Sequence, residues 1–330
     1  MDNTLKLLDE FQELKEKIFS EMHKVIVGQD RIIDRILTGL FAGGHCLLIG
    51  VPGLAKTLMI KTLSEILDLS FKRIQFTPDL MPSDITGTEV IQEDTLSLKR
   101  TLKFLPGPIF ANLILADEIN RAPPKTQAAL LEAMQEYQVT VGGKNYPLPV
   151  PFLVLATQNP IELEGTYPLP EAQLDRFMLS IYIDYPSKEE EKKIAELTTY
   201  QLLSEVDKIL DSKKIIEFQN LIRKIPVSDY IINYGVNLVR STRPNLDHTI
   251  RFVKEYVSWG AGPRATQYLI LAAKAKAALR GDVNVSISDI KEVSPDVLRH
   301  RIFTNFNADA EGINSDAIVK KLLEELPESE

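Results

Sequence analysis

The chain has little that would build a covalent or metal-bound scaffold. Among its 330 residues there are one cysteine, one tryptophan and four scattered histidines. A single cysteine excludes an intramolecular disulfide framework and is typical of a reducing compartment. Cys46 lies inside an apolar run, where we expect it to fill the core rather than to act as a nucleophile. The histidines have no metal-ligand spacing.

Long hydrophobic runs and excess positive charge are also missing. No stretch approaches the roughly 20 apolar residues of a membrane-spanning helix, and the start of the chain, residues 1–18, is charged throughout. We therefore expect a cytoplasmic protein without a membrane span. The net charge of −8 argues against a general nucleic-acid binder. With 44% hydrophobic and 25% charged residues, the composition predicts a soluble globular protein of about two domains.

Residues 50–57, GVPGLAKT, separate an apolar run at 46–49 from a helical pattern that begins at Leu58. A buried strand, a glycine-bearing loop and a helix in this order are typical of a phosphate-binding loop, although an ordinary strand-to-helix turn is the alternative. In such a loop, backbone N–H groups and the helix N-terminus bind the phosphates. We expect Lys56 to reach the outer phosphates and Thr57 to hold Mg²⁺. The expected nucleotide contacts are Gly50, Val51, Pro52, Gly53, Leu54, Ala55, Lys56, Thr57 and Leu58.

Ala55 departs from the usual phosphate-loop pattern, which has glycine before the lysine. Alanine has a Cβ and adopts helical dihedral angles more readily than a positive φ. The phosphate-loop interpretation therefore carries the expectation that residue 55 needs no positive φ.

Asp117 and Glu118 end a second apolar run, residues 113–118. At the carboxyl end of a parallel strand, the following turn can aim both carboxylates toward a nucleotide. Asp117 would then lie in the second shell of Mg²⁺, and Glu118 would orient and polarise the attacking water. A polar strand end or a helix cap is the structural alternative, which the loop at residue 50 makes less favourable.

Two further polar positions follow predicted elements. Asn159 lies among the polar residues at the end of the buried strand expected at 152–160. It could reach the γ-phosphate or the attacking water, although an asparagine before proline is also an ordinary turn residue. Arg176 lies where a short helix meets the next strand. Such an arginine is usually a salt-bridged surface residue, but phosphoryl transfer needs a cation to stabilise transition-state charge.

The strands and helices alternate up to about residue 188, and the later pattern is helical. This predicts an α/β nucleotide-binding domain at 1–188, with a parallel sheet flanked by helices, followed by a small all-helical lid at 189–330. Excursions near 78–108 and 138–150 read as insertions, although the first could be an irregular surface loop. Val27 and Gly28, in a break between two helices, are a plausible seat for the base ring, and a simple interhelix turn fits equally well.

Several stretches together resemble the MoxR family of AAA+ ATPases, in the branch with an insertion in helix two. They are residues 50–57, 82–87 (PSDITG), 106–110 (PGPIF), 115–122 (LADEINRA) and 169–177 (LPEAQLDRF). Their order and spacing also agree with that family. The resemblance covers about residues 24–185 and continues more weakly at 259–265 (WGAGPRA), where Gly262 replaces an expected serine.

The resemblance implies a role for each matching residue. Lys56 and Thr57 bind phosphate and Mg²⁺, and Asp117 and Glu118 are the metal-side and water-activating carboxylates. Asn159 is similar to the first sensor, Arg176 to the arginine finger and Arg264 to the second sensor in the lid. The catalytic set is thus Glu118, Asn159, Arg176 and Arg264, and the metal set is Thr57 and Asp117. The resemblance also implies a hexameric ring, chaperone-like action on protein complexes, and partners with a von Willebrand factor A domain.

The sequence therefore predicts Mg²⁺-dependent ATP hydrolysis coupled to the remodelling or assembly of protein complexes, with lid movement as its mechanical outcome. A nucleotide-gated binding scaffold with negligible turnover is the main alternative, which the Asp117-Glu118 pair disfavours. A phosphotransferase to a small acceptor is the second alternative.

Overall fold

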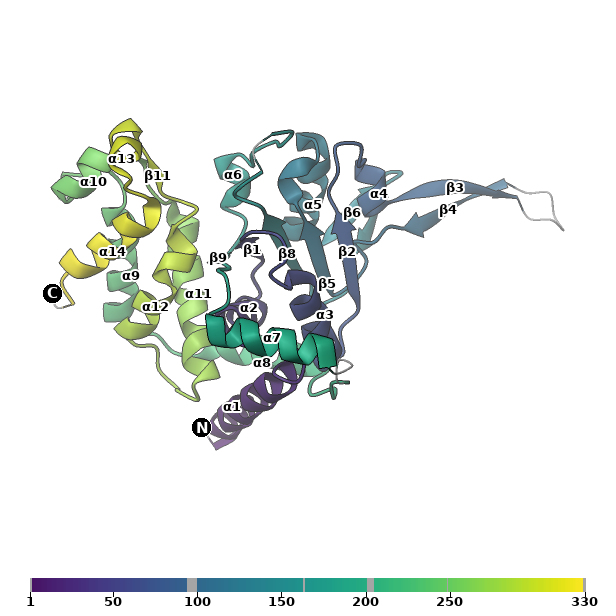
Figure 1. Cartoon of the computed structure of the whole chain (residues 1–330), viewed down its shortest axis with the longest axis horizontal. Coiled ribbons are helices and arrows are strands. Elements are labelled where there is room, and N and C mark those ends of the chain that lie inside the picture. The colour runs from purple at the N-terminus through teal and green to yellow at the C-terminus, as the bar shows by residue number, and fades with distance from the viewer. Residues whose placement is uncertain (1, 94–99, 163, 201–204, 248, 329–330) are drawn as a thin grey trace.

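The structure, a computed structural model, describes residues 2–93, 100–162, 164–200, 205–247 and 249–328. A five-stranded parallel sheet lies at the centre of its N-terminal half (Figure 1). The strand order is β2-β5-β8-β1-β9. The strands are β1 (Cys46–Ile49), β2 (Phe71–Gln75), β5 (Leu113–Asp117), β8 (Leu153–Gln158) and β9 (Leu179–Tyr182).

The register of this sheet brings the ends of its strands together. Gln75 at the end of β2 lies opposite Asp117 at the end of β5, and Ile49 at the end of β1 lies opposite Gln158 at the end of β8. Because all pairs are parallel, the loops that follow these strands leave the sheet at the same edge. That edge is where the candidate site lies.

Alternate residues of the strands pack into separate cores. Leu113 and Leu115 of β5 pack with one core and Ile114 with the other, as the two-residue period of a strand requires. The first core includes α1 (Asp2–Met22), α2 (Asp30–Ala42) and α3 (Lys56–Ile66), and the second includes α5 (Pro124–Glu136). Helices therefore cover both faces of the sheet, as the α/β prediction requires.

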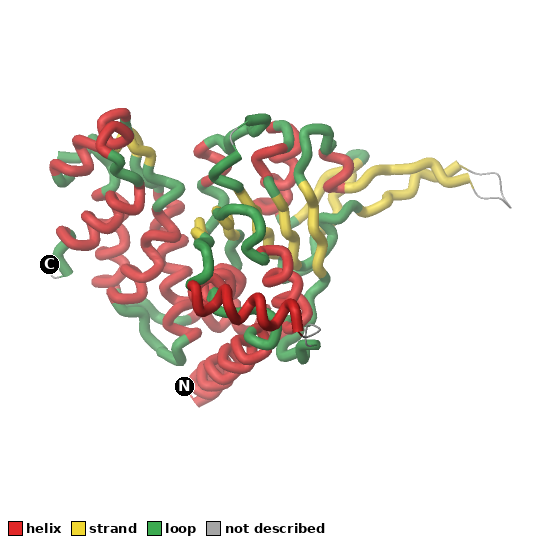
Figure 2. Tube along the Cα trace, viewed as in Figure 1, coloured by secondary structure: helices red, strands yellow, loops and turns green. Residues whose placement is uncertain are grey.

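Two antiparallel hairpins occupy the segments expected as excursions. The helix α4 (Pro82–Thr86) leads into β3 (Gly87–Glu93) and β4 (Arg100–Pro106), which extend far from the body of the molecule (Figures 1 and 2). The second hairpin pairs β6 (Gln138–Val141) with β7 (Lys144–Pro147). The rings of Phe104 and Tyr146 stack with centroids 4.0 Å apart, so the bases of the two hairpins are in contact.

The C-terminal part is helical, as predicted, and includes one small sheet that was not. Its helices are α7 (Lys188–Tyr200), α8 (Ser212–Lys224), α9 (Asp229–Ser241), α10 (Arg251–Tyr256), α11 (Pro263–Leu279), α12 (Ile287–Leu298), α13 (Phe306–Glu311) and α14 (Ser315–Glu325). The strands β10 (Val257–Trp259) and β11 (Phe303–Thr304) pair antiparallel between them. Within the described ranges, no helix has the length and apolar character needed to cross a bilayer.

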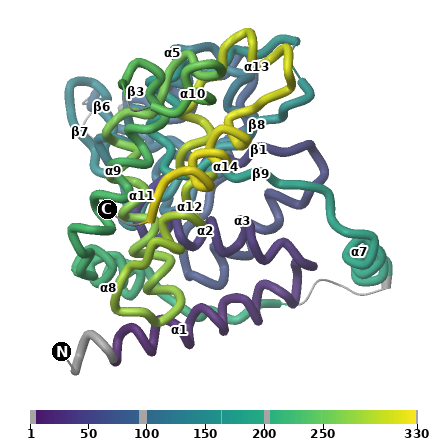
Figure 3. Tube along the Cα trace, turned by 90° about the vertical axis from the view of Figure 1, so that its left-hand side faces the viewer, coloured from purple at the N-terminus to yellow at the C-terminus, as the bar shows by residue number. Residues whose placement is uncertain are grey.

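Two of the helices after residue 188, α7 and α8, lie against the sheet domain rather than among the other helices of the C-terminal part. Phe218 of α8 stacks on Phe11 of α1, with ring centroids 4.4 Å apart, and lies 6.2 Å from the ring of Phe41 in α2. Helix α7 lies across the front of the N-terminal half in Figure 1, and Figure 3 places it at the edge of the molecule, away from α9 and α14. These two helices connect the sheet domain to the lid.

Basic side chains just after α12 join the lid to the sheet domain. Arg301 is 3% exposed and donates hydrogen bonds to the Asp175 and Phe177 carbonyls at 3.0 and 2.6 Å. His300 also contacts the Phe177 carbonyl, at 3.0 Å. The segment around Arg176 is therefore held by the lid.

Candidate active site

A cavity of about 470 Å³ opens at the carboxyl edge of the sheet. Its walls are residues 52–58 of the loop and helix after β1, together with Arg73, Asp117, Glu118, Thr157 and Asn159. Four different strands contribute to it, so the sheet register itself assembles the site. The predicted Lys56, Thr57, Asp117, Glu118 and Asn159 all line this one cavity.

The loop before Lys56 has the close approaches expected of a phosphate cradle. A Cβ on Gly50 would lie 2.6 Å from the Ile183 carbonyl oxygen, so only glycine fits there. The Lys56 ammonium donates to the Gly50 carbonyl across the loop. Burial lowers the pKa of Lys56 from its ordinary value, and the charges of Asp117 and Glu118 oppose that shift.

The expectation that residue 55 needs no positive φ is wrong, because Ala55 is left-handed, with φ 54° and ψ 22°. The residue is the N-cap of α3, and the turn into the helix requires this conformation whatever side chain is present. For a residue with a Cβ, the left-handed region costs about 1–2 kcal/mol, which is small against the stability of a domain. The expectation was wrong because it treated a modest cost as an exclusion.

The Thr157 hydroxyl fixes the two carboxylates relative to each other. It donates to Oδ1 of Asp117 at 2.6 Å and accepts the backbone N–H of Glu118 at 2.8 Å. The other oxygen of Asp117 accepts two hydrogen bonds from Arg73, at 2.6 and 3.0 Å. Asp117 thus has a fixed orientation at the wall of the cavity.

Glu118 is held by its side chain and by its backbone. Its backbone is left-handed, with φ 55°, and precedes the short 3₁₀ helix Ile119–Arg121. Oε2 accepts a hydrogen bond from Gln75 at 3.0 Å and pairs with Arg121 at 3.2 Å. The left-handed conformation costs about 1–2 kcal/mol for a residue with a Cβ, and strained positions of this kind cluster at functional sites.

Asn159 presents a single free polar group. Its side chain Oδ1 accepts the backbone N–H of Ile161 at 3.1 Å, while its Nδ2 is buried with no hydrogen-bond partner among the described residues. Asn159 is 8% exposed and lines the cavity. The unpaired donor is suited to an anionic oxygen, because a buried N–H without an acceptor is costly.

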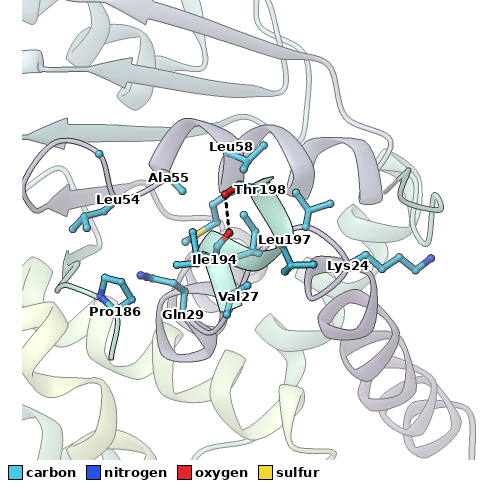
Figure 4. Close-up of a pocket in the computed structure, with 14 residues that line it drawn as sticks. Lys24, Val27, Gln29, Leu54, Ala55, Leu58, Pro186, Ile194, Leu197 and Thr198 are labelled. Atoms are coloured by element: carbon cyan, nitrogen blue, oxygen red, sulfur yellow. Dashed lines mark hydrogen bonds between the residues drawn. The ribbon is translucent and has the colours of Figure 1, made fainter. Parts of the chain in front are cut away.

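A second, narrower cavity of about 160 Å³ adjoins the first (Figure 4). The two share the wall formed by residues 53–55 and 58. Val27 lines this slot, and Gly28 stands beside it, where an added Cβ would collide with the carboxylate of Glu190. The remaining walls include Leu197 and Pro186. The structure thus offers an apolar slot next to a polar cavity, the arrangement that a nucleotide base and its phosphates need.

Two predicted residues are not brought into the phosphate cavity. Nη1 of Arg176 donates to the Leu131 carbonyl at 2.6 Å. Arg264, in the first turn of α11, pairs with Asp175 at 3.0 Å. Gly262 is the N-cap of that helix and supplies no side-chain cap. Neither arginine lines the cavity.

Arg73, Gln75 and Thr157 were not predicted from the sequence. Each contacts Asp117 or Glu118 from a neighbouring strand. The only sequence signal is their position: they lie at or near the ends of strands that flank the one carrying the carboxylates. Because the sequence does not give the strand order, that signal cannot be read without the sheet.

Comparison with known proteins agrees with this geometry. Residues 45–179 match the model of the ATPase family associated with various cellular activities, and residues 251–322 match the AAA lid domain. Over 96% of its length the chain is 44% identical to the Chaperone MoxR1 of Mycobacterium tuberculosis, covering 83% of that protein. It is 40% identical to an uncharacterised Bacillus subtilis protein, YeaC, with 96% and 95% of the two chains covered.

A solved structure extends the comparison to the whole fold. The crystal structure of a putative ATPase from Cytophaga hutchinsonii superposes with a TM-score of 0.90 at 44% identity, covering 98% of this chain and 97% of that one. The predicted resemblance, the fold class and the assignment as an ATP-hydrolysing enzyme are thereby confirmed. The chain belongs to the MoxR family of AAA ATPases.

Proposed function

We propose that this chain hydrolyses ATP with Mg²⁺ by in-line attack of water on the γ-phosphate, and that it couples hydrolysis to the remodelling of protein complexes. The observation that carries the proposal is the convergence of Lys56, Asp117, Glu118 and Asn159 on one cavity beside an apolar slot. Each of these residues supplies a group that phosphoryl transfer to water requires.

The roles follow from the contacts. Lys56 exchanges the Gly50 carbonyl for phosphate oxygens, and the N–H groups of the loop and of α3 add to that positive field. Glu118 accepts a proton from the attacking water once its carboxylate turns from Gln75 and Arg121 toward the cavity. Asn159 donates its free N–H to the γ-phosphate or to the water.

Mg²⁺ fits the oxygen donors that line the cavity. Thr57 offers a hydroxyl and Asp117 a carboxylate, and both are hard ligands of the kind that Mg²⁺ prefers. Because Arg73 and Thr157 already occupy both oxygens of Asp117, that carboxylate is suited to contact the ion through water. The ion would neutralise charge that develops on the phosphates.

Arg176 and Arg264 lie outside the phosphate cavity, so each needs a further step to reach a nucleotide. We propose that Arg264 leaves Asp175 to contact the nucleotide of its own chain, and that Arg176 acts on the nucleotide of a neighbouring copy. A head-to-tail contact between copies closes into a ring, and we propose a hexamer. Protein clients, including partners with a von Willebrand factor A domain, would bind to such a ring. The relative from M. tuberculosis is named a chaperone, which supports this direction.

Replacement of Glu118 by glutamine tests the enzymatic part. Glu118→Gln keeps the shape of the side chain but cannot accept the proton, so we expect ATP binding to persist and steady-state phosphate release to fall by about 10²–10⁴-fold. Glu132→Gln, on the exposed face of α5, is the matched control and should release phosphate at the wild-type rate.

The same assay separates the alternatives. Phosphate release by the wild type without any acceptor excludes both a silent scaffold and a strict phosphotransferase. Unchanged release by Glu118→Gln would overturn the assignment of the base. A pulldown with Glu118→Gln, which should stay bound to ATP, then tests for protein clients.

A further inference from the structure

The apolar slot contains one polar side-chain atom that the fold leaves without a partner. Oε1 of Gln29 is buried and accepts no hydrogen bond from any described residue. The neighbouring slot residues Val27, Leu58, Met59 and Leu197 offer only apolar side chains. A buried acceptor without a donor is costly, and native proteins rarely keep one without a reason.

The local backbone also speaks against a purely structural role. Gln29 is the N-cap of α2, but its side chain makes no capping hydrogen bond. Its φ of 64° lies in the left-handed region that favours glycine. A side-chain cap normally requires an extended backbone at the N-cap residue, so the left-handed Gln29 does not direct its side chain to the end of α2. Its side chain extends along the slot, and Figure 4 shows its amide end beside Pro186.

The slot and the phosphate cavity together limit what can meet this oxygen. They share Gly53, Leu54, Ala55 and Leu58, so a molecule whose phosphates lie on the loop places its base in the slot. The volume of about 160 Å³ suits a flat ring. The edge of adenine carries a 6-amino group, a donor, whereas purines with a 6-oxo group carry an acceptor there.

The other polar side chains of the slot are less suited to this task. The Thr198 hydroxyl already donates to the Ile194 carbonyl at 2.8 Å, and Thr198 is exposed, so water can satisfy its oxygen. Lys24 pairs with Glu21 at 2.7 Å and is a donor only. Gln29 is therefore the residue whose acceptor is paired only when a ligand brings a donor.

We propose that Oε1 of Gln29 accepts a hydrogen bond from the 6-amino group of adenine and is a specificity-determining residue of the nucleotide site. The proposal rests on the nucleotide-binding part of the proposed function. It predicts an energetic coupling between one side chain and one functional group of the ligand.

The coupling is measured by calorimetric titration with two diphosphates, which avoids turnover. ADP carries the 6-amino group, and purine riboside diphosphate is the same molecule without it. We expect the wild type to bind ADP about 10-fold more tightly, as one hydrogen bond to a buried group implies. Gln29→Ala should bind both diphosphates with equal affinity, because the unpaired acceptor is gone.

Two further variants fix the interpretation. Gln29→Glu keeps an acceptor at this position and should keep the preference for ADP. Thr198→Ala changes the same slot without touching the acceptor and should also keep it. Equal binding of the two diphosphates by the wild type overturns the proposal without any mutant, and so does an unchanged preference in Gln29→Ala. If the wild type binds neither diphosphate, the proposed nucleotide site itself fails, which is a separate result.

Discussion

His45 links the stability of the sheet domain to pH. Its ring is buried, accepts the backbone N–H of Val154 at Nδ1 (3.0 Å) and contacts the Met134 carbonyl through Nε2 (3.1 Å). Burial lowers the pKa of His45 to about 4. The unfolded chain titrates near its ordinary value of about 6.5, so between these values the unfolded state binds more protons. The contribution of His45 to the free energy of unfolding is therefore fully present above pH 6.5 and is lost as the pH falls toward 4.

The predicted loss is measurable by urea unfolding at pH 7 and pH 5. His45 should account for about 2 kcal/mol of the difference between the two pH values. His45→Gln cannot titrate, so its difference should be smaller than that of the wild type by this amount. His300, whose pKa burial also lowers, is present in both proteins and cancels. An identical pH dependence in the two proteins would contradict the assignment.

Single residues of the site were predicted from the sequence where the signal is local. The loop at 50–57 and the Asp117-Glu118 pair could be recognised because each lies within one short stretch beside its strand. Arg73 and Thr157 could not, because their partner Asp117 is 44 and 40 residues away. The unpaired oxygen of Gln29 could not be predicted either, because it depends on how the surrounding side chains pack and not on a spacing in the sequence.

Among the elements, α7 is the one whose packing a nucleotide would change. Most of its side chains are exposed, while Ile194 and Leu197 face the slot. A base bound in the slot would cover the side chains of Ile194 and Leu197 and bury them further. We expect ADP to slow amide hydrogen exchange in residues 190–198 by about 5–10-fold, because added burial raises the free energy of local opening.

The helix α9 provides the internal control for this exchange experiment. It lies in the lid, lines neither cavity and should exchange at the same rate with and without ADP. Protection at Lys56 and Thr57 without any change in α7 would show that phosphates bind while the base does not occupy the slot.

At the level of elements, helices were predictable and short strands were not. The helical pattern expected after residue 188 is confirmed by helices such as α9 and α11, because helical spacing over three or more turns is a strong signal. The strands β10 and β11 have three and two residues, and they exist only because Val257 pairs with Thr304 and Trp259 with Phe303. A pairing across some 45 residues leaves no periodic trace in the sequence.

For the molecule as a whole, the lid and the segment that carries Arg176 form one connected unit. Asp175 pairs with Arg264 at 3.0 Å and with Arg301 at 2.7 Å, and both arginines belong to the lid region. Arg176 is the next residue in the chain, so a change in either ion pair of Asp175 also changes the position of Arg176. If Arg264 turns to a bound nucleotide, Asp175 keeps only Arg301, and the setting of Arg176 changes with it.

Action of Arg176 on a neighbouring copy is tested by mixing two inactive proteins. Lys56→Ala cannot hold phosphate but keeps Arg176, whereas Arg176→Ala keeps the phosphate loop, so a contact between one of each restores a complete site. In an equal, random mixture of head-to-tail rings, about one contact in four has this order, and phosphate release should recover to about a quarter of the wild-type rate. Each variant alone should lose about 10³-fold or more. Mass measurement of the mixture establishes that mixed rings form. Mixed rings without any recovery would show that Arg176 does not act across the contact, and that its bond to the Leu131 carbonyl reflects a role within its own chain.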